Sequence, residues 1–165
     1  IFQRSNRVIM HIDKSIKIRT GFKSDLSNIK DIDQSLSIVI DEVYETQKQK
    51  AIKEALKNET ILIAAIDTEI VGYLWYEFLW GYIPFISLIR INKFFHRNGI
   101  GKNLMKFLER KLNEKKVERI LSSTEYENKS AIKFHKSLGY NECGYFKLAH
   151  WSPNKELFFE KILNS

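Results

Sequence analysis

The chain of 165 residues is 44% hydrophobic and 13% aromatic, so we expect a single compact domain with its own core. No uncharged apolar run approaches the roughly 18 residues of a membrane span, and no apolar block of signal-peptide type follows Arg4 and Arg7. Lysine and arginine outnumber aspartate and glutamate by 27 to 20, and the net charge of +7 favours an anionic partner such as a nucleotide, a nucleic acid or a cofactor phosphate.

The chain has one cysteine, Cys143, which excludes an internal disulfide and a cysteine-rich metal site. His11 and His150 have no partners at metal-ligand spacing, so we expect no metal. This cysteine usage fits a reducing compartment, and we expect a cytoplasmic protein without a membrane partner, as a monomer or a homodimer.

Residues 1–15 show no clear period and are expected to form an N-terminal extension, partly disordered or non-native, ahead of a domain over residues 16–165. Alternating apolar and charged residues over 16–19 predict a half-exposed strand. Ser24 offers an N-cap oxygen to a first helix. A second helix is predicted over residues 42–57, with residues 38–41 as a loop or bend before it.

The middle of the chain predicts three strands. Residues 60–66 and 70–79, joined by a turn at 67–69, are typical of an antiparallel hairpin. Gly81 ends the hairpin, and Pro84, which has no backbone donor, suits only the beginning or edge of a third strand over 85–91.

The second half of the chain predicts a helix over 100–116, a strand over 117–124, a short helix over 128–138 and two closing strands over 140–148 and 156–163. Gly139 stands where the short helix should stop. The strand, helix and strand from 85 to 124 imply a parallel pair with a right-handed crossover.

The stretch from His96 to Lys102 places two glycines, Gly99 and Gly101, between a strand and an amphipathic helix. Glycine lets the backbone approach a ligand closely, and the first free N–H groups of a helix favour an anion together with the helix dipole. The turn therefore predicts a phosphate site, with pyrophosphate as the obvious anion. A plain helix entry with glycine at a tight turn gives the same pattern.

Two motifs, found in this order of elements, resemble the GNAT family of N-acetyltransferases. The family's Arg/Gln-x-x-Gly-x-Gly/Ala turn is similar to residues 96–101, with His96 at the basic or glutamine position. A second pattern of the family, Asn-x-x-Ala-x-x-Phe-Tyr-x-x-x-Gly-Phe, matches Asn128, Ala131, Phe134, His135, Gly139 and Tyr140, with histidine in place of the tyrosine. The resemblance covers nearly everything from Ile16 to Leu163.

The resemblance implies one α/β (α+β) domain, in which a central mixed sheet of about seven mostly antiparallel strands has helices on both faces. It also implies acetyl-CoA as cosubstrate, bound where a pair of parallel strands splays apart. The unpaired edge of a splayed strand can pair with the amide-bearing pantetheine arm. The residues that the resemblance gives to the cofactor are Ile89, Arg90, Ile91, Arg97, Asn98, Gly99, Ile100, Gly101, Lys102, Asn128 and Phe134.

The implied reaction is direct attack of an amine, on a small molecule or a protein, upon the thioester in a ternary complex. It requires a donor for the developing oxyanion and an acid for the departing thiolate. By resemblance the donor is the backbone N–H of Ile89. The tyrosine that protonates the thiolate in the family is replaced here by His135, and a histidine can act as the acid because it titrates near neutrality. The alternative is that His135 only packs or bonds locally. Tyr126 and Tyr140 are rival acids.

Two carboxylates are candidates for the general base, acting through a water. Glu77 lies on the long strand of the hairpin, and Glu125 follows the strand after the glycine-turn helix. Each is also explained as a solvated carboxylate at a strand end.

Three further interpretations concern partners. The aromatic residues Trp75, Tyr76, Phe78 and Trp80 alternate along a strand as packing residues do, and no clustered-arginine helix is present, so we expect no nucleic acid. Acidic residues near the first two helices form either a rim that draws a cationic amine or ordinary helix-end charges; they are Asp31, Asp33, Asp41, Glu42 and Glu45. The alternative function is a CoA-binding regulatory or interaction module with weak or no turnover.

Overall fold

The structure is a computed structural model that describes residues 15–36, 42–147 and 155–163. The predicted extension, the loop at 38–41 and the connection between the last two strands fall wholly or almost wholly outside these ranges. The strands are β1 (Ile16–Thr20), β2 (Ile61–Ile66), β3 (Glu69–Leu79), β4 (Ile83–Ile91), β5 (Arg119–Glu125), β6 (Asn141–Phe146) and β7 (Glu156–Ile162). The helices are α1 (Leu26–Ser35), α2 (Glu42–Lys57), α3 (Ile100–Glu114) and α4 (Lys129–Ser137), with 3-10 turns η1 (Lys23–Asp25) and η2 (Lys93–Phe95).

The seven strands form one sheet in the order β1-β2-β3-β4-β5-β7-β6, and every neighbouring pair is antiparallel except β4 and β5. This confirms the predicted mixed, mostly antiparallel sheet. The parallel pair is joined through α3, as the strand-helix-strand spacing predicted.

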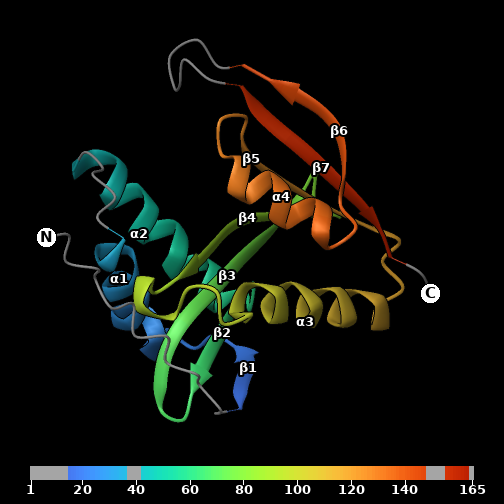
Figure 1. The fold of residues 1–165 in the computed structure, drawn as a ribbon. Coiled ribbons are helices and arrows are strands. Elements are labelled where there is room, and N and C mark those ends of the chain that lie inside the picture. Colours follow the sequence, from blue (N-terminus) through green and yellow to red (C-terminus); the bar gives the residue numbers. More distant parts are fainter. Residues whose placement is uncertain (1–14, 37–41, 148–154, 164–165) are drawn as a thin grey trace, which may run out of the picture.

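Each face of the sheet has its own apolar core beneath helices. On one face, side chains of α1 and α2 such as Ile29 and Ile52 pack with Ile63 and Tyr73. On the other face, α3 contributes Leu104 and Leu108, and α4 and the strands around it complete the cluster. Figure 1 shows α1 and α2 on one side of the sheet and α3 crossing the other. The predicted covering of both faces is confirmed.

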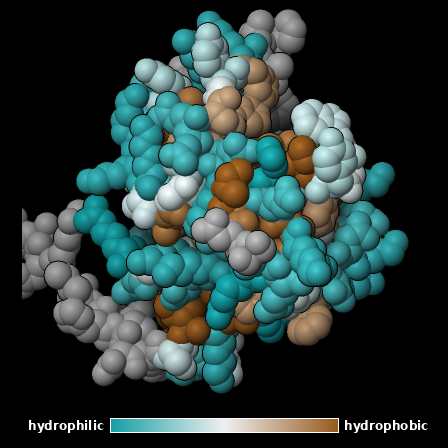
Figure 2. Space-filling model, turned by 90° about the vertical axis from the view of Figure 1, so that its right-hand side faces the viewer, coloured by the Kyte–Doolittle hydropathy of each residue, from teal (hydrophilic) through white to brown (hydrophobic). Residues whose placement is uncertain are grey.

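The surface of the described residues is rich in polar side chains. From the side shown in Figure 2 it is mainly hydrophilic, and hydrophobic residues show only in separate patches. No described helix is both long and apolar enough to cross a bilayer.

The start of α1 differs from the prediction. Ser24 does not cap the helix, because it lies inside the turn η1 that precedes it. The carboxylate of Asp25 takes over this corner: it accepts a hydrogen bond from the backbone N–H of Phe22 at 2.7 Å and two from the guanidinium of Arg19, at 2.7 and 2.8 Å. The bonds to Arg19 lower the pKa of Asp25. Because the ion pair links β1 to the turn, it fixes where α1 begins.

The strands β4 and β5 pair only where they start, through Phe85 with Leu121 and Ile86 with Ser122. At this point β4 carries a bulge, since Tyr76 faces Ile86 but the preceding Trp75 faces Leu88, which leaves Ser87 as the extra residue. Beyond the bulge, β4 continues beside β3 and leaves β5. The predicted splay is therefore present, and it opens the edge of β4 from Ser87 to Ile91.

Candidate active site

A cleft of about 1430 Å³ occupies the splay. Its walls are the open edge of β4, the end of β5, the turn before α3, and one side of α4, with contributions from Leu36 and Tyr44 near α1 and α2. Of the residues that the sequence proposed for cofactor binding, all but Asn98 line this cleft. Positions from residue 89 to residue 134 are thus brought together by the fold.

Backbone conformation and two hydrogen bonds set the shape of the glycine turn over residues 96–101. Gly99 has φ of +73° and Arg97 has φ of +66°, so both adopt the left-handed conformation that glycine tolerates best. His96 Nε2 lies 2.8 Å from the carbonyl of Ile91, and Asn98 Nδ2 donates to the carbonyl of Phe95 at 3.1 Å. The first contact fixes the turn against the end of β4, and the second fixes it against η2.

The first amides of α3 are available to a ligand. The first hydrogen bond of the helix runs from the N–H of Asn103 to the carbonyl of Gly99, at 3.0 Å. Within the described part of the chain, the N–H groups of Ile100, Gly101 and Lys102 have no such acceptor. These three donors, at the positive end of α3, are suited to an anion.

Gly101 also lets α3 approach α4. A Cβ atom at this position would lie 3.3 Å from Cζ of Phe134, closer than side chains normally pack. The neighbouring Asn128 caps α4, because its side-chain oxygen accepts the N–H of Ala131 at 3.0 Å. Both Asn128 and Phe134 line the cleft beside the turn.

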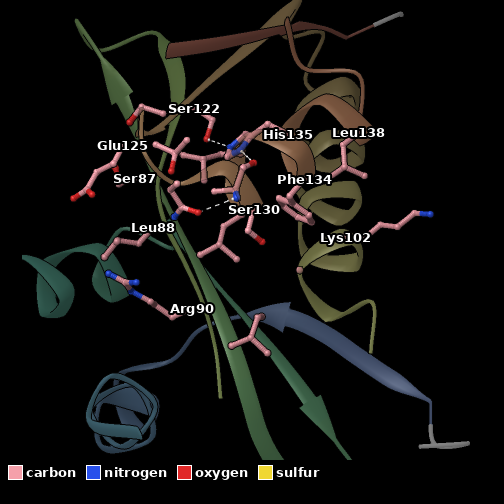
Figure 3. A pocket seen from close by; sticks show the side chains of 18 of the residues that line it. Ser87, Leu88, Arg90, Lys102, Ser122, Glu125, Ser130, Phe134, His135 and Leu138 are labelled. Atoms are coloured by element: carbon pink, nitrogen blue, oxygen red, sulfur yellow. Dashed lines mark hydrogen bonds between the residues drawn. The ribbon is translucent and has the colours of Figure 1, made fainter. Parts of the chain in front are cut away.

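The three predicted residues of β4 point in two directions. Ile89 and Ile91 pack against the core beneath α3, whereas Leu88 packs against the core beneath α1 and α2. Because side chains alternate along a strand, Arg90 shares the face of Leu88. Figure 3 shows Leu88 and Arg90 extending toward α2, with Phe134 and Lys102 on the other side. Only the backbone of Arg90 belongs to the open edge.

His135 is buried and hydrogen bonded at both ring nitrogens. Its Nδ1 lies 2.8 Å from the carbonyl of Ala131, and its Nε2 lies 2.8 Å from Oγ of Ser122, which is also buried. A carbonyl only accepts, so Nδ1 carries the hydrogen of the neutral ring and Nε2 accepts the hydroxyl of Ser122. Burial lowers the pKa of His135 from its ordinary value, which favours this neutral form.

The predicted carboxylates occupy different places. Glu125 lines the cleft and lies directly opposite Glu156 of β7, which lines it too. Ser123 donates its hydroxyl to Glu156 at 2.6 Å. Glu77 is exposed and outside the lining, and it accepts the hydroxyl of Ser87, which does line the cleft.

Neither rival tyrosine lines the cleft. Tyr126 is 45% exposed and stacks under the ammonium of Lys129, 4.2 Å from the ring centre. Tyr140 is buried and donates its hydroxyl to Glu109 at 3.1 Å; burial and this carboxylate raise its pKa. The two rival tyrosines therefore do not compete with His135 at the cleft.

The acidic residues that were considered as a rim for a cationic amine do not line the cleft where the structure describes them. Asp33 is buried: it forms an ion pair with Lys48 and accepts the hydroxyl of Tyr73 at 2.7 Å. Asp41 lies outside the described residues. Asp31, Glu42 and Glu45 do not line the cleft, and the described residues include no cluster of His, Cys, Asp and Glu that could hold a metal ion.

Several cleft residues were missed from the sequence. Ser122, Glu156, Phe85 and Phe158 meet there because of strand pairings between distant segments. The one available signal was the alternation of Ser122 with the buried Ile120, which places both on one face of β5. Tyr44 could not be assigned, because the approach of α2 to β4 depends on packing.

A sequence model described as the Acetyltransferase (GNAT) family matches residues 26–140. No curated protein matches the chain.

Solved structures share the fold at low sequence identity. The ribosomal-protein-S18-alanine N-acetyltransferase from Escherichia coli superposes with a TM-score of 0.76 at 15% identity, covering 92% of this chain and 96% of that one. Ard1 from Thermoplasma volcanium superposes with a TM-score of 0.77 at 18% identity, covering 91% of this chain and 99% of that one. The structure of yncA, a putative acetyltransferase from Salmonella typhimurium with its cofactor acetyl-CoA, superposes with a TM-score of 0.68 at 18% identity. The match covers 90% of this chain and 94% of that one.

The family match spans both motifs, the glycine turn and the segment from Asn128 to Tyr140. The fold, the splayed parallel strands and the order of elements agree with it. The chain therefore belongs to the GNAT family of acetyltransferases.

Proposed function

We propose that the protein is an acetyl-CoA-dependent N-acetyltransferase that modifies a primary amine of a small molecule or protein by direct attack in a ternary complex. The observation that carries the proposal is the set of three open amides, from Ile100 to Lys102, at one end of a cleft whose other wall is the open edge of β4. One end suits a pyrophosphate, and the other suits an amide-bearing arm.

The residues present fit acetyl-CoA. The left-handed Gly99 directs the amides of Ile100, Gly101 and Lys102 outward, and the exposed side chains of Arg97 and Lys102 add positive charge. The edge of β4 from Ile89 to Ile91 offers backbone donors and acceptors to the pantetheine arm, with Asn128 and Phe134 facing it. When bound, acetyl-CoA supplies an activated acetyl group as a thioester.

The remaining chemistry is a transfer of one proton. The N–C bond forms as the C–S bond breaks, so the amine must lose a proton and the sulfur must gain one. In this proposal the backbone N–H of Ile89 donates to the oxygen on which charge develops. Neutral His135 accepts the amine proton through the hydroxyl of Ser122 and returns it to the sulfur, which makes it the acid of the second half-step.

Glu125 assists at the other side of the cleft. It lines the acceptor side with Glu156, and two carboxylates there attract the ammonium form of an amine before it loses its proton. Glu77 is the weaker candidate for a base, because its carboxylate is engaged by Ser87 outside the lining.

The proposal is tested by measuring both binding and turnover. Titration calorimetry of acetyl-CoA with Gly101→Val should show weaker binding, because valine crowds the open amides and Phe134. Asn113→Val is the matched control, since it places the same side chain in the last turn of α3 and should bind normally. Unchanged affinity in a folded Gly101→Val protein would remove the pyrophosphate site from the turn.

Thiol release over a panel of amines separates the enzyme from a binding module. An acetyltransferase releases CoA in proportion to acetylated amine. A protein that binds acetyl-CoA with the expected dependence on Gly101 but acetylates no amine in the panel would instead be the regulatory module.

A further inference from the structure

Arg90, on the side of the cleft that α1 and α2 cover, has no carboxylate partner among the described residues. Arg90 lines the cleft from the face of β4 that α1 and α2 cover. Within the described ranges it forms no ion pair, and its Nε atom is buried without a hydrogen-bond acceptor. A buried donor on a charged group is normally satisfied, so this exception calls for a partner other than the described residues.

Two other partly or fully buried cations in the same half of the protein are paired with carboxylates. Arg19 makes a two-bond contact with Asp25, and Lys48 is paired with Asp33. Asp33 is the carboxylate next to Tyr73, the residue opposite Arg90 on β3. Its two oxygens are already used by Lys48 and by the hydroxyl of Tyr73. It therefore does not neutralise Arg90.

Glu45 is the other carboxylate whose charge reaches Tyr73. It accepts a hydrogen bond from Nε2 of Gln49 at 2.7 Å, and it forms no ion pair with Arg90. Neither of these described carboxylates pairs with Arg90, which lines the cleft. A planar guanidinium is suited to a carboxylate, because its parallel N–H groups match the two carboxylate oxygens.

The far side of the same cleft has the opposite charge. Glu125 and Glu156 lie directly across from each other on β5 and β7, and both line it. Between these carboxylates and Arg90 the wall is apolar, with Phe85, Leu88 and Phe158 among its residues. A ligand that satisfies the whole surface carries a positive group, an apolar body and a negative group.

We propose that Arg90 is a specificity-determining residue that binds a carboxylate on the acceptor, so that the preferred substrate is an amine that also carries a carboxylate. The amine lies toward Glu125 and Glu156, and the carboxylate lies toward Arg90. This inference rests on the proposed acetyltransferase function. The proposed role belongs to the side chain of Arg90 and not to its backbone, which is proposed to meet the cofactor. The side chain lies on the opposite face of β4 from those of Ile89 and Ile91.

The test compares amines that differ only in this group. Thiol release is measured with three pairs of amines, each made of a carboxylate and its carboxamide. The pairs are leucine and leucinamide, phenylalanine and phenylalaninamide, and 4-aminobutyrate and its amide. The wild-type protein should favour the carboxylate member of its best pair in kcat/KM by about tenfold or more. Arg90→Gln should abolish that preference, and Arg90→Lys should keep part of it because the charge remains.

Arg110→Gln is the matched control. It removes the same charge from an exposed position on α3 outside the cleft, and the preference should remain. A preference of the wild type for the amides, or an equal preference in wild type and Arg90→Gln, would overturn the proposal. Because the ratio is taken within each protein, a general loss of activity does not imitate the effect.

A second measurement needs no variant. The N-acetylated carboxylate product should inhibit the wild type competitively with the amine, and its carboxamide should inhibit much more weakly. Equal inhibition by the two would contradict the role of Arg90 even if Arg90→Gln fails to fold. Failure of the proposed function looks different, because no amine of either kind would then release thiol from acetyl-CoA.

Discussion

The Nε2 atom of His135 lies 2.8 Å from the hydroxyl oxygen of Ser122, and both residues are almost completely buried at the floor of the cleft. The ring is oriented by its second nitrogen, which lies 2.8 Å from the carbonyl of Ala131 one turn earlier in α4. The ring also stacks on Phe159, with centroids 4.7 Å apart. The hydroxyl of Ser122 is thus bonded to the ring nitrogen that carries no hydrogen, and both residues line the cleft.

Ser122→Ala removes that hydroxyl while leaving the imidazole in place. We expect kcat to fall by about tenfold or more, with little change in the affinity for acetyl-CoA, because a proton relay is lost and no cofactor contact is removed. Steady-state thiol release and calorimetry measure the two quantities. Ser24→Ala, an exposed serine of η1, should leave both unchanged.

His135→Phe should lower turnover by about 10²-fold or more, the usual effect of losing a general acid. His135→Tyr should keep part of the activity, since tyrosine stands at this position in the resembled motif. If the wild type and a folded His135→Phe variant turned over equally, the proton would be transferred by water or by another group and not by His135.

The lowered pKa of His135 also predicts how stability depends on pH. The unfolded chain binds a proton near the ordinary value of 6.5, whereas the folded chain binds it only at lower pH. The unfolded state therefore gains protons first as the solution is acidified. The contribution of His135 is present above pH 6.5 and declines as pH falls from there through the lowered pKa. Urea unfolding from pH 7.5 to 5 should show this decline in wild type relative to His135→Phe, and parallel curves would contradict it.

Much of this fold could be predicted from periodicity and turn residues alone. The hairpin of β2 and β3, the glycine turn and the amphipathic α3 each have a local pattern that the structure follows. The cap of α1 was predicted wrongly, because Asp25 is fixed by Arg19 on a neighbouring strand and no local pattern contains that contact. Ser24 has a hydroxyl that could accept a backbone N–H, but it lies inside η1 and not immediately before α1.

The site was predictable only where it is local. The glycine turn and the motif around Asn128 each occupy a short stretch, so their residues could be named in advance. The opposition of Glu125 and Glu156 depends on the register between β5 and β7, and the direction of Arg90 depends on which face of β4 the helices cover. Neither follows from the sequence without the sheet.

The buried ion pair of Lys48 and Asp33 is a strong test of how α1 and α2 are held together. Lys48→Met should lower the free energy of unfolding by about 3 to 5 kcal/mol, because Asp33 would keep a buried charge with the hydroxyl of Tyr73 as its one partner among the described side chains. Adding Asp33→Leu should recover much of the loss. Lys57→Met is the control: its ion pair with Glu54 is exposed at 3.4 Å, so little change is expected in urea unfolding.

Glu125→Gln and Glu77→Gln form a matched pair that distinguishes the two candidate bases. Both changes remove one carboxylate charge from a strand, but only Glu125 lines the cleft. We therefore expect Glu125→Gln to lower kcat/KM for the amine by about tenfold or more while the KM for acetyl-CoA stays unchanged, and Glu77→Gln to have a small effect. The reverse order would show that Glu77, acting across Ser87, contributes more to turnover than Glu125. Salt then separates the two ways in which Glu125 can work. If its carboxylate only attracts the ammonium group, the defect lies in KM and shrinks as salt screens the charge, whereas a carboxylate that accepts the proton leaves a defect in kcat that salt does not relieve.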